Sequence, residues 1–496
     1  MKLRRRAGGN PAYRGRPEDQ MYGFGQLLAY GTQHILTMYG GVIAPPLIVG
    51  GAAGLSPGDM ALLVTAGLFV SGLATLLQTL GIGPVGSRLP IVQGISFASV
   101  STMVAIASED GLQPVFGAII VAGLIGLVLS SFFAQLVRLF PAVVTGTIIT
   151  VIGLSLMPVA FRWAMGNNSD APDFGSMGNI GYAGLTLCII LVISRLFQGT
   201  LSRLSILIGL VAGTVIAAIA GKADFSKVGD ADILALPPIL HFGAPTFELG
   251  AIISMTIVIL VIMTETTADI LAIGEIVGTK VDAKRVGAGL RADMASTAVA
   301  PLFGTFPASA FAQNVGLVAL TGIKSRYAVA MGGLVLLLLG LLPVVGAVVA
   351  AIPYPVLGGA GIVLFGSVAA SGIRTLSRVD YDDNLNMIIV SVAIAVGIIP
   401  IAAPDFWSAF PEWFGVIMHS GISATAIVAV VLNVLFNEIK GGKKPGASVM
   451  AAAETERDKL GDTLDDEMKG QQKPPIIVRR RQDDHQAHSG RKDGNR

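Results

Sequence analysis

Two adjacent amides, Gln313 and Asn314, stand in the otherwise apolar stretch FAQNVGLVALTG (311–322). A side-chain amide in a hydrophobic segment costs free energy unless it finds hydrogen-bond partners. Such amides could simply join neighbouring helices, but Pro307 and Gly316 also indicate a broken backbone here, which joining does not require. A short helix that begins near Asn314 would direct free N–H groups and a favourable dipole toward a bound molecule.

Four ionisable residues also fall inside hydrophobic stretches: His34, Glu265, Asp269 and Asp293. Charges at membrane depth are costly, so they usually have a function. Glu265 and Asp269 are four residues apart and therefore share one face of a helix. A carboxylate that accepts N–H bonds, opposite a planar amide that donates and accepts, suits a flat heterocycle with alternating carbonyl and N–H groups. We therefore expect a ligand shaped like a nucleobase.

An aromatic ring, Phe97 or Phe311, could stack on such a ligand. Structural roles stay open for three of the ionisable residues. Asp293 could cap or pair near a span entrance, Asp269 could accept from nearby hydroxyls, and His34 could brace helices. Glu265 lies mid-span among three threonines, and is the strongest functional candidate.

Composition shows which elements must position these residues. The chain has 496 residues, of which 53% are hydrophobic and 13% charged, against roughly 25% charged in soluble proteins. Apolar runs recur up to Phe436, and many reach the ~20 residues that a membrane helix needs. The sequence predicts an all-α polytopic membrane protein with fourteen spans, near 24–49, 58–81, 89–107, 113–137, 140–162, 178–198, 202–221, 247–275, 287–304, 306–322, 326–350, 354–372, 384–404 and 413–437.

The distribution of Lys and Arg supports this count. With the N-terminus cytoplasmic, twelve Lys and Arg residues fall in the cytoplasmic connections and three in the opposite ones. The positive-inside rule then places both termini in the cytoplasm. The basic, polar start of the chain lacks the apolar core of a signal peptide.

The two halves of the chain also resemble each other. LFPAVVTGTIITVIG (139–153) is similar to IPYPVLGGAGIVLFG (352–366), and RLPIVQGISFASV (88–100) to TFPASAFAQNVGL (305–317). Seven spans separate the halves, and an odd number inverts the second half relative to the first. Inverted repeats with interrupted segments at matching positions are typical of transporters, whose site lies where those segments meet. The repeat places His34 and Glu265 in corresponding spans that border this site.

Several functions are not supported by any motif. The sequence contains no HExxH, no GxSxG and no Cys/His pairing, so we expect neither an enzyme nor a metal or cofactor site. No P-loop is present to bind ATP, which leaves the buried carboxylates and histidine as proton sites. The single Cys188 excludes an internal disulfide. The charged tail after Asn437 is expected to be disordered, with a possible helix near 449–468, and its histidines, His485 and His488, to be solvated.

The stretch QNVGLVALTG (313–322) resembles the signature of the nucleobase-ascorbate transporters. That signature is a Gln, Glu or Pro followed by N-x-G-x4-T and then Arg, Lys or Gly. Further elements resemble the same family, over about residues 20–437: Gln33 with His34, Glu265 to Asp269 (ETTAD), Gly94 to Ala98 (GISFA) and the region of Asp293.

The resemblance implies a fold of fourteen segments in two inverted seven-segment repeats, with short strands in segments 3 and 10. A core domain (23–137 and 247–350) and a gate domain (138–246 and 351–437) would lie between cytoplasmic tails (1–22 and 438–496). It also implies a homodimer in the plasma membrane and an elevator-type mechanism.

Substrate would lie between the two strands. The implied substrate-binding residues are Glu265, Gln313, Phe97, Asn314, Gly316 and Thr37, and those implied in proton coupling or site support are His34, Asp269, Asp293 and Gln33. Gln313 together with ETTAD resembles the xanthine and uric acid branch, so we expect a purine and H+ as partners and no nucleic acid. A uracil or broader nucleobase symporter and a sulfate-permease-like anion transporter remain as alternatives.

Overall fold

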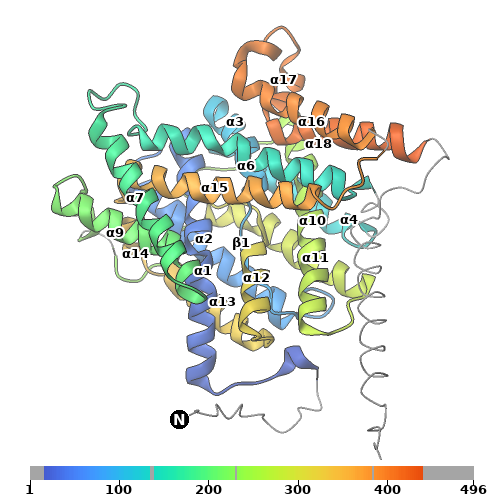
Figure 1. The fold of residues 1–496 in the computed structure, drawn as a ribbon, viewed down its shortest axis with the longest axis horizontal. Coiled ribbons are helices and arrows are strands. Elements are labelled where there is room, and N and C mark those ends of the chain that lie inside the picture. The colour runs from blue at the N-terminus through green and yellow to red at the C-terminus, as the bar shows by residue number, and fades with distance from the viewer. Residues whose placement is uncertain (1–15, 134–138, 230–231, 383–384, 440–496) are drawn as a thin grey trace, which may run out of the picture. The chain divides into compact units, whose positions relative to one another are not determined.

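Helices make up most of the protein in the computed structural model, which describes residues 16–133, 139–229, 232–382 and 385–439. Figure 1 shows their arrangement. The predicted helix near 449–468 and the two tail histidines lie outside these residues. The elements in chain order are η1 (Pro17–Asp19), α1 (Phe24–Ala52), α2 (Pro57–Leu80), β1 (Gln93–Ile95), η2 (Phe97–Ser99), α3 (Val100–Asp110), α4 (Leu112–Leu129), α6 (Ala142–Ala164), α7 (Met177–Leu196), α8 (Thr200–Arg203), α9 (Ser205–Ile219), η4 (Ser226–Val228), α10 (Leu249–Val277), α11 (Ala283–Val299), η5 (Ala300–Phe303), β2 (Ala308–Ala310), α12 (Ala312–Thr321), α13 (Arg326–Gly340), α14 (Pro343–Ala350), α15 (Tyr354–Leu376), α16 (Leu385–Ala402), η6 (Pro404–Trp407), α17 (Glu412–His419), α18 (Gly421–Asn433) and η7 (Val434–Glu438).

Within the described ranges, nine helical stretches are long and apolar enough to cross a membrane, or ten if the bent pair of α13 and α14 counts as one span. The protein is therefore a multi-pass membrane protein. The count of fourteen segments stays a prediction, because several of the others are short. α3, α11 and α12, which fall in the third, ninth and tenth predicted spans, have 11, 17 and 10 residues.

Two of the predicted spans are not continuous helices. The span 326–350 breaks between α13 and α14, which meet at an angle of 79°. Pro343 lacks the N–H that would continue the ladder, and it begins α14 instead. The span 413–437 divides at Ser420, whose side chain accepts a hydrogen bond from Ser423 N and so caps α18.

Close backbone contacts hold α6 against α15, and Figure 1 shows the two helices side by side. A Cβ added to Gly153 would lie 2.2 Å from Ala369 N, and one added to Gly358 would lie 2.3 Å from Ala164 N. Glycine allows this approach because it has no side chain, as is common between membrane helices. These two helices belong to a group with α7, α9, α16 and α18, which pack mainly on one another.

The interrupted segments meet as a two-stranded antiparallel ribbon, formed by β1 and β2. Gln93 pairs with Ala310, Gly94 with Ser309 and Ile95 with Ala308. The prediction of short strands in the third and tenth segments is confirmed. Backbone groups that leave a helix inside an apolar interior must be satisfied within the protein, and each strand supplies the partners for the other.

A second group of helices surrounds this ribbon. β1 packs against α1 and α2, and β2 packs against α10 and α11. Each strand then leads into a short helix: η2 and α3 follow β1, and α12 follows β2. α12 begins at Ala312, two residues before the predicted start, and α10 packs against it.

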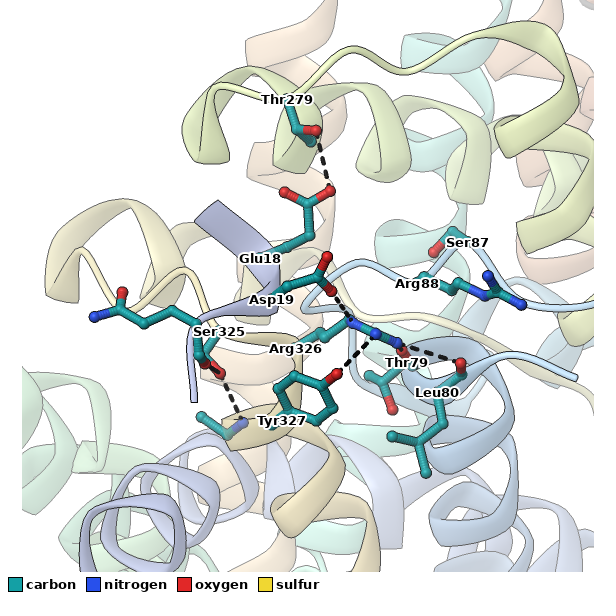
Figure 2. A network of polar contacts seen from close by, with 12 residues as sticks. Glu18, Asp19, Thr79, Leu80, Ser87, Arg88, Thr279, Ser325, Arg326 and Tyr327 are labelled. Atoms are coloured by element: carbon teal, nitrogen blue, oxygen red, sulfur yellow. Dashed lines mark hydrogen bonds and ion pairs between the residues drawn. The ribbon is translucent and has the colours of Figure 1, made fainter. Parts of the chain in front are cut away.

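The segment before α1 is fastened to this second group by two ion pairs, as Figure 2 shows in part. Glu18 accepts hydrogen bonds from Arg285 at 2.8 Å and Thr279 at 3.0 Å. Asp19 accepts one from Arg326 at 2.7 Å. We call Glu18 and Asp19 the acidic clamp.

The two arginines in turn bind backbone carbonyls. Arg285 donates to Ser87 O at 2.7 Å and to Arg88 O at 3.0 Å. Arg326 donates to Thr79 O at 2.9 Å, near the end of α2 where carbonyls lack helical partners. The acidic clamp therefore connects the end of α2, the loop that follows it, and the starts of α11 and α13.

Substitution in the acidic clamp should destabilise the protein unequally. Glu18→Gln should lower the apparent melting temperature by several degrees, since the Glu18 side chain is only 1% exposed and breaking a buried pair costs ~3–5 kcal/mol. Asp19→Asn is the matched control, because the Asp19 side chain is 35% exposed and should matter less. Equal shifts in the two variants would contradict this account of the clamp.

Candidate substrate-binding site

A cavity of about 320 Å³ opens beside the first turns of α12 and lies between the two helix groups. Its lining brings together several residues that the sequence predicts for the site. They are Thr37 from α1 and Gln313 and Gly316 from α12. A larger cavity, of about 550 Å³ between α2, α14 and the start of α15, is lined by none of the predicted site residues.

Gln313 is the predicted residue that the structure presents most openly. Its side chain is exposed and forms part of the cavity wall. Gly316 follows three residues later on the same helix face. Asn314 N donates to Phe311 O at 2.9 Å, whereas the N–H groups of Ala312 and Gln313 precede the first helical acceptor, so the start of α12 offers donors and a partial positive charge.

Asn314 joins separate segments instead of entering the cavity. Its side chain is 2% exposed, its Oδ1 accepts a hydrogen bond from His34 Nδ1, and its Nδ2 donates to Pro90 O at 3.5 Å. For this amide, the structure matches the alternative that it joins helices. Its backbone N–H donates to Phe311 O at 2.9 Å.

The first helix carries three of the predicted residues, Gln33, His34 and Thr37, within two turns. His34 is buried, and its Nε2 has no hydrogen-bond partner among the described residues. The Thr37 hydroxyl donates to Gln33 O at 2.8 Å, and both of these side chains are half-buried. α1 thus places a hydroxyl at the cavity and a histidine against α12.

The carboxylates of α10 do not line the cavity. Glu265 and Asp269 are half-buried, and they are close enough to interact electrostatically. The packing of α10 against α12 and β2 brings their helix next to the one that carries Gln313. Direct contact between Glu265 and a ligand at Gln313 therefore remains a prediction.

Asp293 lies in a fully buried polar cluster that includes a residue the sequence analysis missed. Its carboxylate accepts hydrogen bonds from Thr266 Oγ1 at 2.5 Å and from Gln78 Nε2 at 3.4 Å. Ala310 N donates to the same threonine at 3.4 Å. The cluster thus connects α2, α10, α11 and β2. Gln78 could have been identified from the sequence, because it is an amide within the apolar helix α2.

Phe97 and Phe311 do not line the cavity, but both rings lie next to Gly41, which does. The Phe97 and Phe311 ring centroids are 6.5 Å apart, and Phe97 also lies 6.1 Å from Phe365. The Phe311 ring covers two glycines: an added Cβ at Gly94 would lie 2.3 Å from it, and one at Gly41 would lie 2.7 Å from it. Phe97 keeps a partly exposed face, whereas Phe311 is only 4% exposed.

Arg203, which the sequence does not predict as a site residue, also lines the cavity. It contributes the cavity's one charged side chain. Among the residues that the structure describes, no group of three or more His, Cys, Asp or Glu could hold a metal ion.

Solved structures identify the class of fold. The transmembrane domain of a cyanobacterial bicarbonate transporter, BicA, aligns with a TM-score of 0.53 and 16% identity, over 82% of this chain and 96% of that one. Murine Slc26a9, an anion transporter in the inward-facing state, aligns with a TM-score of 0.59 and 14% identity, over 84% of this chain and 69% of that one. At this identity the likeness shows a shared fold.

Sequence relatives identify the family. The profile of a group described as "Permease family" matches residues 25–406. The xanthine permease of Bacillus subtilis is 40% identical over 422 residues, which cover 85% of this chain and 96% of the relative. The uric acid transporter UacT of Escherichia coli is 40% identical over 423 residues, which cover 84% of this chain and 88% of the relative. The chain therefore belongs to this permease family, as its motifs predicted, and is a transporter, not an enzyme.

Close packing at the Phe311 ring should make one glycine of α1 sensitive to a single methyl group. We expect Gly41→Ala to reduce substrate uptake at least tenfold without loss of protein, because the new Cβ would displace the ring beside the cavity. Gly51→Ala is the control on the same helix, where an added Cβ meets nothing within 4 Å. Equal uptake by the two variants at equal abundance would contradict this prediction.

Proposed function

We propose that this protein is a proton-coupled symporter that imports purine nucleobases, xanthine or uric acid, across the plasma membrane. The observation that carries the proposal is the placement of Gln313 in the cavity beside the free start of α12. The 40% identity to a xanthine permease and a uric acid transporter supports the same class of substrate.

In the proposed site a purine lies against the first turn of α12. The Gln313 amide forms hydrogen bonds with one edge of the purine, since it can both donate and accept. Glu265 accepts ring N–H bonds, which are strengthened by its charge. Phe97 offers a partly exposed ring for stacking. Thr37 and the backbone at Asn314 and Gly316 complete the contacts.

Proton coupling is assigned to ionisable groups that connect segments. Asp293 accepts bonds from α2 and α10, while Asp269 lies close enough to interact with it electrostatically. His34, next to Gln33, holds α12 through Asn314. A change of protonation at these groups would alter contacts around the ribbon, which is how a proton could be linked to movement.

The proposed movement is a sliding of a core domain against a gate domain. The core domain comprises residues 23–137 and 247–350, around the ribbon, and the gate domain comprises residues 138–246 and 351–437. The two groups of packed helices support this division. The proposal includes fourteen segments in two inverted repeats, cytoplasmic termini and a homodimer.

Two alternatives lead to different substrates. A uracil or broader nucleobase symporter would use the same site, but its polar groups would favour the hydrogen-bonding edge of a different base. A sulfate-permease-like anion transporter is favoured only by the fold shared with BicA and Slc26a9. The Glu265 carboxylate, in its proposed role as an acceptor, needs a ligand that carries N–H groups, and an inorganic anion such as sulfate has none.

Uptake by cells that express the protein tests the proposal. We expect labelled xanthine and urate to accumulate, uracil and sulfate not to compete, and a protonophore to abolish accumulation while removal of Na+ does not. Uptake of sulfate without purine uptake would overturn the substrate class. Strict dependence on Na+ would overturn the proton assignment and leave the substrate class standing.

Loss of the Glu265 charge should weaken purine binding. Glu265→Gln keeps the shape but replaces one acceptor with a donor that faces the N–H groups of the ligand. Charge-assisted bonds contribute ~1.5–3 kcal/mol each, so the dissociation constant should rise about tenfold or more. The control is Glu275→Gln, the same change at an exposed position near the end of α10. Equal xanthine affinity in both purified variants would remove Glu265 from the site.

A further inference from the structure

Arg203 reaches from one helix group toward the helix that carries Gln313. It is the last residue of α8, between α7 and α9. Both terminal nitrogens of its guanidinium would lie 3.9 Å from a Cβ added to Gly316. The missing side chain at Gly316 therefore leaves space for the cation beside α12, one helical turn from Gln313.

The charge of Arg203 stands alone in this cavity. The other lining residues are apolar or neutral, and Gln313 and Thr37 supply polar groups. Within the described ranges, the three ion pairs found all lie elsewhere, and none includes Arg203. A half-buried cation without a counter-charge costs free energy. A negatively charged ligand in the cavity would offset that cost.

We propose that Arg203 is a specificity-determining residue that favours oxopurines carried as anions. This inference rests on the proposed purine transport. A deprotonated oxopurine spreads its charge over carbonyl oxygens and ring nitrogens in one plane. A guanidinium is planar as well and can donate two parallel bonds to such an edge. The ligand would then meet the amide of Gln313 and the cation of Arg203 along the same face of α12.

A structural role for Arg203 predicts a different result. Basic residues often lie at the cytoplasmic ends of membrane helices, where they contact lipid headgroups and fix topology. Such an arginine would affect protein abundance or all substrates alike. Discrimination between a charged and a neutral purine is the property that only a substrate contact gives.

Binding of two purines, measured at the same pH, distinguishes a substrate contact of Arg203 from a structural role. In mildly acidic buffer uric acid is largely a monoanion, whereas xanthine is largely neutral. We expect Arg203→Gln to weaken urate binding about tenfold and xanthine binding about twofold at most, since a charge-assisted bond is worth about that ratio. Arg203→Lys should restore part of the urate affinity because it keeps the charge.

The matched control is Arg195→Gln, an exposed arginine at the end of α7 that does not line the cavity. It should bind both purines as the wild type does. Equal weakening of urate and xanthine in Arg203→Gln, or no weakening of either, overturns the inference while the proposed function stands. If the wild-type protein binds neither purine, the proposed function fails and this inference fails with it.

Discussion

Backbone groups that leave a helix inside an apolar interior must find hydrogen-bond partners within the protein, and this constraint organises the centre of the molecule. The third and tenth segments satisfy it by pairing β1 with β2. Additional bonds run from Ser96 N to Pro307 O at 2.8 Å and from Phe311 N to Val92 O at 3.1 Å. The pairing ends where α12 begins, and the first turn of this helix carries Gln313, which lines a cavity.

The surrounding polar side chains serve the same constraint. Asn314 holds α12 to α1 through His34, and Asp293 holds α11 to α2 and α10. The acidic clamp fastens the loops that connect these helices on one side. Residues that brace the ribbon and residues offered to a ligand are therefore neighbours in sequence, and Gln313 beside Asn314 is the clearest case.

Local patterns in the sequence predicted the two interrupted segments and a helix that starts within two residues of the observed start of α12, whereas the paired strands followed only from the family resemblance. Proline and glycine near a polar pair mark a broken segment, and the repeat between 88–100 and 305–317 indicates two such segments. Contacts between distant segments could not be predicted in this way. Gln78 and Asp293 are 215 residues apart, and no periodicity places Arg203 beside Gly316. The bend at Pro343 was missed because hydropathy is continuous through it.

The central claim is that a purine binds at the start of α12. A cryo-electron microscopy structure of the protein with bound xanthine tests this claim most directly. The account predicts density for the purine against the first turn of α12, within hydrogen-bond reach of Gln313 and with Glu265 on its other edge. Density for xanthine in the larger cavity between α2 and α14, with the space beside Gln313 empty, would contradict it.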